Sequence, residues 1–441
     1  AVFDTAILGS NPSAPAKLMN TLILNLNFLS KLKIKIFPFY RSKEIKEIFK
    51  ILEETRENDD KKNVAMFVGG CVRKYLQNQK IDDIDIATVF SPEELRKKFK
   101  NTNIKFIETG IEHGSITLLS GEKKFEITTL RKDIKTDGRH AKIEFTDNWQ
   151  EDSNRRDFTI NAIYLDKNGK IFDPQLGLSD LKNNIVKFIG DPIKRIEEDY
   201  LRIIRFIRFS LQYNSDLETS TMQAIKLKLN GIKNLSKERI LNELFKILDL
   251  KNFNDLAYKK DLINIFKLIF PELKFLKRLE NLNLIKDQFK IEKKLLLTIL
   301  LIDDSNNYDY FCHKYKVSND INKYLATYAK CYSELQTDKN FFKKNLKKNL
   351  YHFGKETIKN LYLISFLNKK KINLKDFKKN IKIILETKFP KFLFNGEYLK
   401  KRGLIEGKKI GDALKELEKN WIKNEFHLTE QEIFSIISKI K

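Results

Sequence analysis

The spacing of apolar residues changes once along this chain, and the change limits the folds that the chain can adopt. Up to residue 174, short apolar runs with the two-residue period of β-strands occur among runs of helical period. Beyond residue 180 the strand pattern disappears, and the long apolar runs have helical spacing. The sequence therefore predicts an α+β fold, in which a head with a mixed sheet precedes an all-helical arm.

The same patterns predict the individual elements. In the head we expect two helices, at 43–54 and 71–77, and strands at 64–68, 84–88, 113–119, 124–130, 158–165 and 170–172. In the arm we expect helices at 193–213, 220–229, 236–248, 286–301, 357–366, 411–418 and 429–440. Residues 1–41 are expected to form an irregular extension, with a transit peptide as the alternative.

Length and composition exclude several classes of protein. A chain of 441 residues is too long for one core, so we expect about two to four domains. The apolar runs are too short to cross a bilayer. The three Cys, far apart and without a CxxC pair, exclude a disulfide framework and a zinc knuckle, and they indicate a reducing compartment.

The charge indicates a polyanionic partner. The net charge is +25, and such an excess usually accompanies nucleic-acid binding, although AT-rich codon usage is an alternative source of lysine. Eleven of the 15 Arg lie between Arg73 and Arg239. Where codon usage favours Lys, Arg should persist where a planar fork is needed, so this span is expected to hold a phosphate- or base-reading site.

The strongest local motif couples a glycine turn to two carboxylates. Gly69 and Gly70 stand between a predicted strand and a helix that carries Arg73 in its first turn, an arrangement that suits a phosphate. Asp83 and Asp85 are two residues apart on the next predicted strand, so both should lie on one face. Two carboxylates on one face favour a bound cation, and beside phosphate this indicates Mg²⁺.

Two further motifs are rich in arginine. Arg155, Arg156 and Asp157 precede a predicted strand and suit a triphosphate and a ribose, with a solvated strand end as the alternative. On the predicted helix 193–213, Glu198, Asp199, Arg202, Arg205 and Arg208 form one polar stripe. Arginine without lysine on this stripe favours a buried cleft, and the alternative is an intrahelical ladder of ion pairs.

In sequence these motifs resemble the class II tRNA nucleotidyltransferases, the CCA-adding enzymes, to which bacterial poly(A) polymerases are related. The resemblance spans residues 63–244 with a weaker echo at 403–414, and it rests on GGCVR…DIDIAT, FEITTLR…DGRHAKIEF, RRDFTINA and RIEEDYLRIIRFIRF. It implies a polymerase-β-like head at 42–174, a neck at 175–250, a body at 251–375 and a tRNA-binding tail at 376–441.

The resemblance also implies roles for individual residues. Asp83, Asp85 and Glu126 would be catalytic, and Asp83 and Asp85 would hold Mg²⁺. The implied nucleotide-binding residues are Gly69, Gly70, Arg73, Arg156, Asp157, Asn161, Asp199, Arg202, Arg205 and Arg208. The implied flexible loop, which lets the site change from C to A, contains Arg131, Asp137 and Arg139.

The residue types agree with a preference for C and A. A carboxylate such as Asp199 accepts from an exocyclic amine, and a guanidinium such as Arg202 donates to a ring acceptor. Cytosine and adenine both offer this pair of groups, whereas uracil and guanine present the reverse. We therefore expect CTP and ATP as substrates, and the acceptor arm and 3′ end of tRNA as partner, without an obligate protein partner or a membrane.

One position departs from the family pattern, which has Asp where this chain has Lys74. A lysine there would repel Arg73 or join it at the phosphates, which keeps a catalytically silent RNA-binding protein as an alternative. Within the same class of enzyme, poly(A) addition and partial CC or A addition are the alternatives to full CCA addition. The expected compartment is the bacterial cytoplasm, with an organellar matrix as the alternative.

Overall fold

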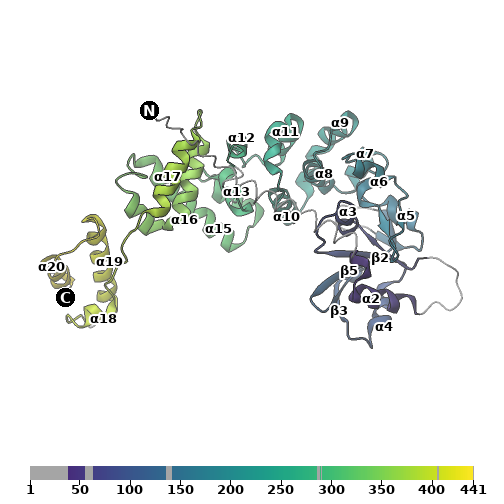
Figure 1. The fold of residues 1–441 in the computed structure, drawn as a ribbon, viewed down its shortest axis with the longest axis horizontal. Coiled ribbons are helices and arrows are strands. Elements are labelled where there is room, and N and C mark those ends of the chain that lie inside the picture. The colour runs from purple at the N-terminus through teal and green to yellow at the C-terminus, as the bar shows by residue number, and fades with distance from the viewer. Residues whose placement is uncertain are drawn as a thin grey trace, which may run out of the picture. The chain divides into compact units, whose positions relative to one another are not determined.

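The computed structural model describes residues 38–54, 63–135, 142–285, 289, 291–404 and 407–440. Contacts divide the chain into two compact units, Ala1–Leu235 and Ser236–Lys441. The strands that the structure describes all belong to the first unit, and the described elements of the second are helices (Figure 1). The predicted α+β class, with a mixed sheet before a helical arm, is confirmed.

A seven-stranded sheet forms the centre of the first unit. Its strands lie in the order β3-β4-β5-β2-β1-β8-β9, and β2 and β5 are parallel whereas the other neighbours are antiparallel. A separate hairpin pairs β6 with β7. The bounds are β1 Ala65–Val68, β2 Ile84–Thr88, β3 Lys105–Gly110, β4 Ser115–Ser120, β5 Lys123–Thr129, β6 Arg131–Lys135, β7 Lys142–Phe145, β8 Tyr164–Leu165 and β9 Ile171–Phe172.

Helices pack on this sheet and continue the unit beyond it. Helix α3 contacts β1 and β2, α2 packs with α4, and α7 packs with α8 and α9. The bounds are η1 Phe39–Arg41, α2 Lys43–Glu53, α3 Gly70–Leu76, α4 Pro92–Phe99, η2 Ile111–His113, α5 Trp149–Asn154, η3 Thr159–Asn161, α6 Gly177–Lys182, α7 Pro192–Glu198, α8 Leu201–Gln212, α9 Thr219–Lys228 and η4 Leu229–Asn234.

The second unit is built from amphipathic helices around aromatic and aliphatic residues such as Phe266 and Phe270. Helix α16 contains a break at Gly354, whose φ of 79° lies in the left-handed region. The bounds are α10 Lys237–Leu248, η5 Phe253–Tyr258, α11 Lys260–Ile269, α12 Arg278–Asn283, α13 Lys293–Leu301, α14 Asn307–Tyr315, α15 Asn319–Thr337, α16 Leu346–Leu367, α17 Leu374–Glu386, α18 Gly396–Lys400, α19 Gly407–Lys423 and α20 Glu430–Ile440.

The strand predicted at 158–165 is wrong in its first half. Residues Thr159–Asn161 form the short helix η3, and only Tyr164–Leu165 pair as a strand. The Asn161 amide donates to Asp157 Oδ1 over 2.6 Å, and the Phe158 N–H donates to the same oxygen. These local side-chain hydrogen bonds give the backbone an alternative to pairing in the sheet. The spacing of apolar residues, on which the strand prediction rested, does not reveal such bonds.

The single helix predicted at 193–213 is also wrong. Asp199, with φ −155° and ψ 105°, separates α7 from α8, and its carboxylate accepts from the Leu201 N–H over 3.1 Å. The next residue, Tyr200, packs directly against Gly231. A Cβ atom built on Gly231 would lie 1.9 Å from the Tyr200 ring. The local side-chain hydrogen bond of Asp199 and this close packing therefore outweigh the continuous apolar stripe.

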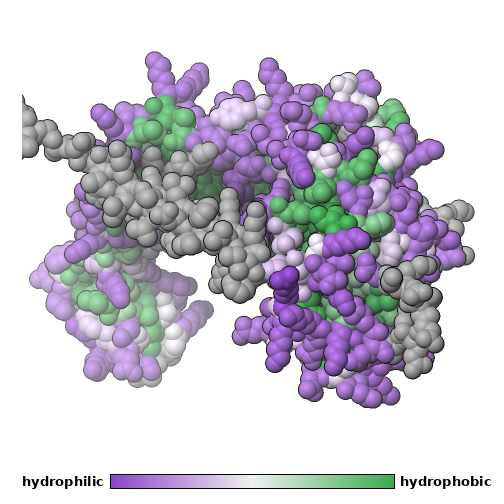
Figure 2. Space-filling view, turned by 45° about the vertical axis from the view of Figure 1, so that its right-hand side comes forward, coloured by the Kyte–Doolittle hydropathy of each residue, from purple (hydrophilic) through white to green (hydrophobic). Residues whose placement is uncertain are grey.

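No helix among the described residues is long and apolar enough to cross a membrane. Figure 2 shows a face on which hydrophilic side chains predominate and hydrophobic ones gather in separate patches. This surface agrees with the high proportion of charged residues, 32% of the chain.

Candidate active site

The turn from β1 into α3 brings the backbone close to a carboxylate. Gly69 has a φ of 72°, and a Cβ built there would lie 3.3 Å from Asp85 Oδ2. The Gly70 N–H donates to Asp85, which helps to stabilise the charged carboxylate. Glycine at position 69 is therefore required both by its φ and by the space that Asp85 occupies.

Asp85 and Glu126 lie opposite each other on the parallel strands β2 and β5. Burial and the nearby charge of Glu126 raise the pKa of Asp85, although Arg156 and Arg73 oppose this shift. Asp83 precedes β2 instead of lying on it, and it is exposed. In the described part of the chain, no group of three or more His, Cys, Asp or Glu side chains is close enough to hold a metal.

A lysine lies among these carboxylates. Lys124 Nζ is 2.7 Å from Glu126 Oε1, and that hydrogen bond, with the charges of Glu126, Asp83 and Asp85, raises the pKa of the ammonium group. These carboxylates thus favour a cation at the centre of the sheet, as their hard oxygen atoms would favour a divalent metal ion. Sequence reasoning missed Lys124, since a lysine on a strand in a lysine-rich chain gives no signal.

Arg73 is held by polar and aromatic side chains. Its Nε donates to the Tyr213 hydroxyl over 2.9 Å, its Nη1 donates to Asn161 Oδ1, and the guanidinium lies 5.0 Å from the centre of the Phe209 ring. A guanidinium with these neutral partners keeps its full positive charge for an anion.

Arg156 is fixed by a buried carboxylate that sequence reasoning missed. Asp152, with no exposed surface, accepts from Arg156 Nη2 over 3.0 Å, from Arg155 Nε over 2.8 Å and from the Tyr164 hydroxyl over 2.7 Å. Burial alone would raise the pKa of Asp152, but Arg156 and Arg155 lower it well below its usual range. Its position three and four residues before the two arginines, which follow the end of α5, was the available signal.

Asp157 is joined to the arginines of α8. Arg205 Nε donates to Asp157 Oδ2 over 2.7 Å, and the charge of Arg205 lowers the pKa of the buried carboxyl group despite its desolvation. Arg208 lies over the Phe209 ring, with its Cζ 4.2 Å from the ring centre. The structure therefore brings Asp157, Asn161, Arg73 and Arg205 together around one side of η3 and α8.

Arg202, only 8% exposed, is bonded within the protein. Its Nη1 lies 2.5 Å from Glu198 Oε2, and the guanidinium also donates to the carbonyl oxygens of Arg195 and Arg155. Glu198 ends α7 while Arg202 lies at the start of α8, so the pair bridges the break at Asp199. The predicted stripe on one helix is thus replaced by two helix ends that meet.

Four other positions named in the sequence analysis have separate outcomes. Lys74 Nζ lies 3.3 Å from Asp82 Oδ2, so this lysine has an acidic partner of its own. Arg131 begins β6, where burial and the charge of Arg155 lower its pKa to about 10. Asp137 and Arg139 lie outside the described residues.

The glycine turn, the carboxylates on β2 and β5, and the fixed arginines combine the features needed to hold a nucleoside triphosphate beside a cation. Three family models match the chain: the poly A polymerase head domain over residues 65–187, the RNA and SrmB-binding site of polymerase A over 216–276, and tRNA nucleotidyltransferase domain 2 over 288–437. The fold and the site define a nucleotidyltransferase.

Relatives specify the family. The chain is 31% identical over 390 residues to the mitochondrial CCA tRNA nucleotidyltransferase 1 of Danio rerio, covering 84% of this chain and 86% of that protein. It is 32% identical over 387 residues to the CCA-adding enzyme of Lactococcus lactis, covering 85% and 93%. The chain belongs to the family of CCA-adding tRNA nucleotidyltransferases.

Solved structures share the fold. The CCA-adding enzyme of Bacillus stearothermophilus in complex with CTP has a TM-score of 0.63 at 23% identity, covering 90% of this chain and 98% of that chain. The Thermotoga maritima CCA-adding enzyme with tRNA has a TM-score of 0.60 at 21% identity, covering 92% and 98%. Enzymes of this family generally use divalent metal ions.

Proposed function

We propose that this chain adds C, C and A in turn to the 3′ end of tRNA, using CTP and ATP and releasing pyrophosphate. The observation that carries the proposal is the pairing of Asp85 with Glu126 across β2 and β5, beside the Gly69 turn and the arginines of the first unit. The names of the relatives that cover most of the chain supply the reaction.

In this proposal, the chain's own residues bind and orient the nucleotide. Gly69 and Gly70 let the backbone approach the phosphates, Arg73 and Arg156 neutralise them, and Asp157 with Asn161 contacts the ribose. The support for these roles is that Asp152 and Asn161 hold the two guanidinium groups in fixed positions. Fixed donors cost little reorganisation when charge develops on the phosphates.

Base choice is assigned to the polar residues of α7 and α8. Asp199 would accept from the exocyclic amine of C or A and Arg202 would donate to the ring nitrogen, while Arg205 and Arg208 support the pocket. Asp157 and Phe209 restrict the last two arginines to one region of α8. Reading the base requires Arg202 to exchange part of its bonding with Glu198 for the nucleotide.

Mg²⁺ suits the carboxylates near β2 and β5, because their hard oxygen donors already attract the Lys124 ammonium group. Asp83 and Asp85 would hold the ion, with Glu126 as the third catalytic carboxylate. Bound there, Mg²⁺ would supply Lewis-acid stabilisation of phosphate charge. Asp85 must be ionised for this role, and its hydrogen bond from Gly70 favours that state.

A direct experiment tests the reaction. The purified protein is incubated with a tRNA that ends at the discriminator base, with CTP, ATP, or both, and the 3′ ends are sequenced. We expect two C additions with CTP alone and CCA with both nucleotides. A run of A would instead support poly(A) addition, the alternative that the matched head model favours by its description. No extension of the tRNA in any reaction would refute both CCA addition and poly(A) addition.

The remaining assignments belong to the same proposal. The head at 42–174, neck at 175–250, body at 251–375 and tail at 376–441 would divide catalysis, base choice and tRNA binding, and the loop with Arg131, Asp137 and Arg139 would support the change from C to A. The net charge of +25 supports tRNA as the partner. The relatives named above come from a mitochondrion and from a bacterium, which supports a bacterial cytoplasm or an organellar matrix as the site of action.

A further inference from the structure

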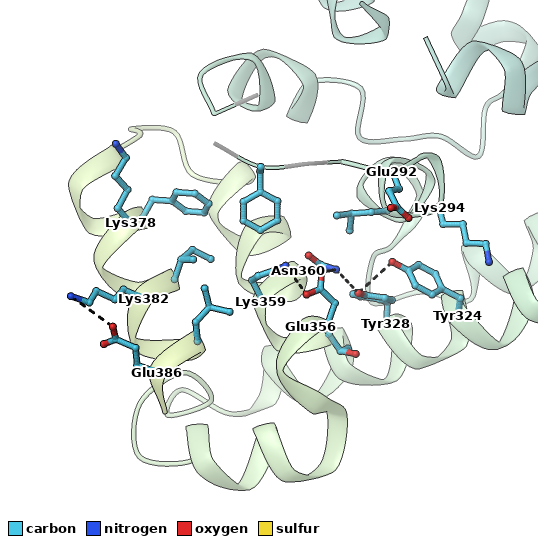
Figure 3. Close-up of a pocket in the computed structure, with 16 residues that line it drawn as sticks. Glu292, Lys294, Tyr324, Tyr328, Glu356, Lys359, Asn360, Lys378, Lys382 and Glu386 are labelled. Atoms are coloured by element: carbon cyan, nitrogen blue, oxygen red, sulfur yellow. Dashed lines mark hydrogen bonds and ion pairs between the residues drawn. The ribbon is translucent and has the colours of Figure 1, made fainter. Parts of the chain in front are cut away.

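A cavity of about 930 Å³ lies within the second unit, between helices α13, α15, α16 and α17 (Figure 3). None of its lining residues belongs to the candidate active site of the first unit. Its volume is that of a site for a small organic ligand. The wall that α17 contributes is apolar, and it consists of Phe377, Ile381 and Leu385.

The polar side of this cavity contains an unsatisfied acceptor. Asn360 is 3% exposed, and its Nδ2 donates to the Tyr328 hydroxyl over 2.9 Å and to Glu356 Oε1 over 3.3 Å (Figure 3). Its Oδ1 is buried and has no hydrogen-bond partner among the residues that the structure describes. Because a buried acceptor without a partner costs free energy, the cavity favours a ligand that brings an N–H or O–H donor.

A donor lies beside this acceptor. The Tyr328 hydroxyl oxygen accepts from Asn360 and also from the Tyr324 hydroxyl, which is 3.4 Å away. Both bonds use the oxygen of Tyr328, so its own proton can serve a ligand acceptor. The edge of a nucleobase carries donor and acceptor groups side by side, and its flat faces suit the apolar wall.

Lysines flank the cavity at opposite ends. Lys294 on α13 and Lys378 on α17 lie on opposite sides of it (Figure 3), and within the described ranges neither has a carboxylate at ion-pair distance. By contrast, Lys359 is paired with Glu356 and Lys382 with Glu386. A nucleotide within a strand has a phosphate on either side, whereas a free nucleotide has phosphates at one end only. The two lysines therefore favour a strand.

We propose that this cavity binds one unpaired nucleotide of an RNA strand. The base would enter against the apolar wall and bond to Asn360 Oδ1 and the Tyr328 hydroxyl, and the flanking phosphates would meet Lys294 and Lys378. This site is separate from nucleotide transfer, so it can be tested by binding alone, whatever the outcome for the proposed function.

The test uses the full chain and a fluorescent single-stranded hexaribonucleotide with a blocked 3′ end, followed by fluorescence anisotropy. Asn360→Leu removes the acceptor at nearly constant volume, and we expect it to weaken hexamer binding at least threefold. Binding of a blunt RNA duplex, which offers no unpaired base, should not change. Lys378→Glu should weaken hexamer binding in the same way, while its exposed neighbour on α17, Lys379→Glu, serves as the matched control.

Cross-linking locates the bound base. A hexamer with 4-thiouridine should cross-link to peptides of α15 or α17 in the wild type, and the yield should fall in the Asn360→Leu variant. Hexamer affinity within threefold of wild type, in both the folded Asn360→Leu variant and the Lys378→Glu variant, would overturn the proposal. Displacement of the cross-link by free CMP as effectively as by unlabelled hexamer would overturn the assignment to a strand. If Asn360→Leu does not fold, the proposal is decided by comparing the hexamer affinity of Lys378→Glu with that of Lys379→Glu.

Discussion

Asp85 on β2 and Glu126 on β5 face each other across a parallel strand pair, and the charge of Glu126 helps to raise the pKa of Asp85. Parallel pairing is confined here to these two strands among the neighbours in the sheet. Its register pairs Asp85 with Glu126, and so it brings residues 41 positions apart to the same height on adjacent strands. The two carboxylates place negative charge at the centre of the sheet, and a cation must balance this charge.

Loss of either aspartate should stop catalysis while tRNA still binds. Asp83→Ala and Asp85→Ala are expected to reduce CMP and AMP incorporation below about a tenth of wild type, because the cation loses a ligand. The tRNA affinity should change less than about twofold, since phosphate contacts elsewhere dominate docking. Single-nucleotide incorporation and filter binding measure the two quantities. More than a tenth of the activity in either variant would refute the metal assignment.

Removal of Lys124 should make the site more sensitive to Mg²⁺. This ammonium group is bonded to Glu126 and lies near Asp83 and Asp85, so it competes with an added cation. Lys124→Met should lower the Mg²⁺ concentration for half-maximal incorporation by about two- to fivefold. Lys123→Met is the matched control, because Lys123 is bonded to Glu44 instead. Equal Mg²⁺ dependence in the two variants would show that Lys124 does not compete.

Asp152 should matter for nucleotide binding as well as stability. Asp152→Asn leaves the guanidinium groups of Arg155 and Arg156 without their buried counter-charge, which costs about 3–5 kcal/mol in such pairs. We expect a lower Tm and a higher KM for both CTP and ATP. Tyr164→Phe removes one donor to Asp152 and one acceptor of Arg156 Nε but keeps the counter-charge, so it should cost only about 1 kcal/mol and raise KM less than Asp152→Asn does. An unchanged KM in a folded Asp152→Asn variant would limit Asp152 to a structural role.

Regular helices and strands were predictable because their apolar residues recur with the period of a helix or of a strand. The strand at 84–88 is confirmed as Ile84–Thr88, and the Ser236 cap of α10 is confirmed by its bond from the Arg239 N–H. Helix α4 was missed although Ser91 and Glu94 form a capping box at its start, a signal that the sequence contained. The break at Asp199 could not be predicted from the period of apolar residues, since it depends on a local hydrogen bond from the Leu201 N–H to the Asp199 carboxylate.

The candidate site was predictable where residues lie close in the sequence, such as Gly69, Gly70 and Arg73. The partners of these residues come from distant positions: Tyr213 bonds to Arg73 across 140 residues, and Lys124 approaches Asp83 and Asp85 from another strand. One sequence without an alignment contains no signal for such pairs. Such pairs form through tertiary contacts. The approach of Lys124 to the aspartates, for example, became visible only with the register of the sheet.

Lys74→Asp is expected not to raise nucleotide affinity. Lys74 is bonded to Asp82, so it does not oppose Arg73, and a carboxylate in its place would face Asp82 with like charge. The Kd for CTP should stay within about twofold of wild type or become weaker. Lys80→Asp offers a control, because Lys80 contacts Asp82 from the other side but is almost fully exposed. Tighter CTP binding in Lys74→Asp would show that Lys74 disturbs the phosphate site.

Acid should destabilise the first unit partly through Glu44. The hydrogen bond from Lys123, 2.8 Å long, is the main cause that lowers the pKa of Glu44 to about 2 from its ordinary 4.5. A lowered carboxyl pKa contributes stability above pH 4.5, and that contribution is lost as the pH falls from 4.5 towards 2. Glu44→Gln should therefore reduce the fall of Tm between pH 5 and pH 3, as measured by thermal unfolding. The exposed Glu54→Gln should leave that fall unchanged.

Arg202→Ala should change base choice as well as stability. Arg202 is buried against Glu198 and against the carbonyl oxygens of Arg155 and Arg195, so its loss should lower Tm. If it also donates to the base, the correct base loses a bond worth about 1–3 kcal/mol, and UTP gains relative to CTP. Glu198→Gln separates the two effects, because it removes the ion pair and keeps the guanidinium group. The measurement is kcat/KM for CTP and UTP on both folded variants. A CTP/UTP ratio within about threefold of wild type in Arg202→Ala, less than about 0.7 kcal/mol, would leave Arg202 as a structural link between α7 and α8.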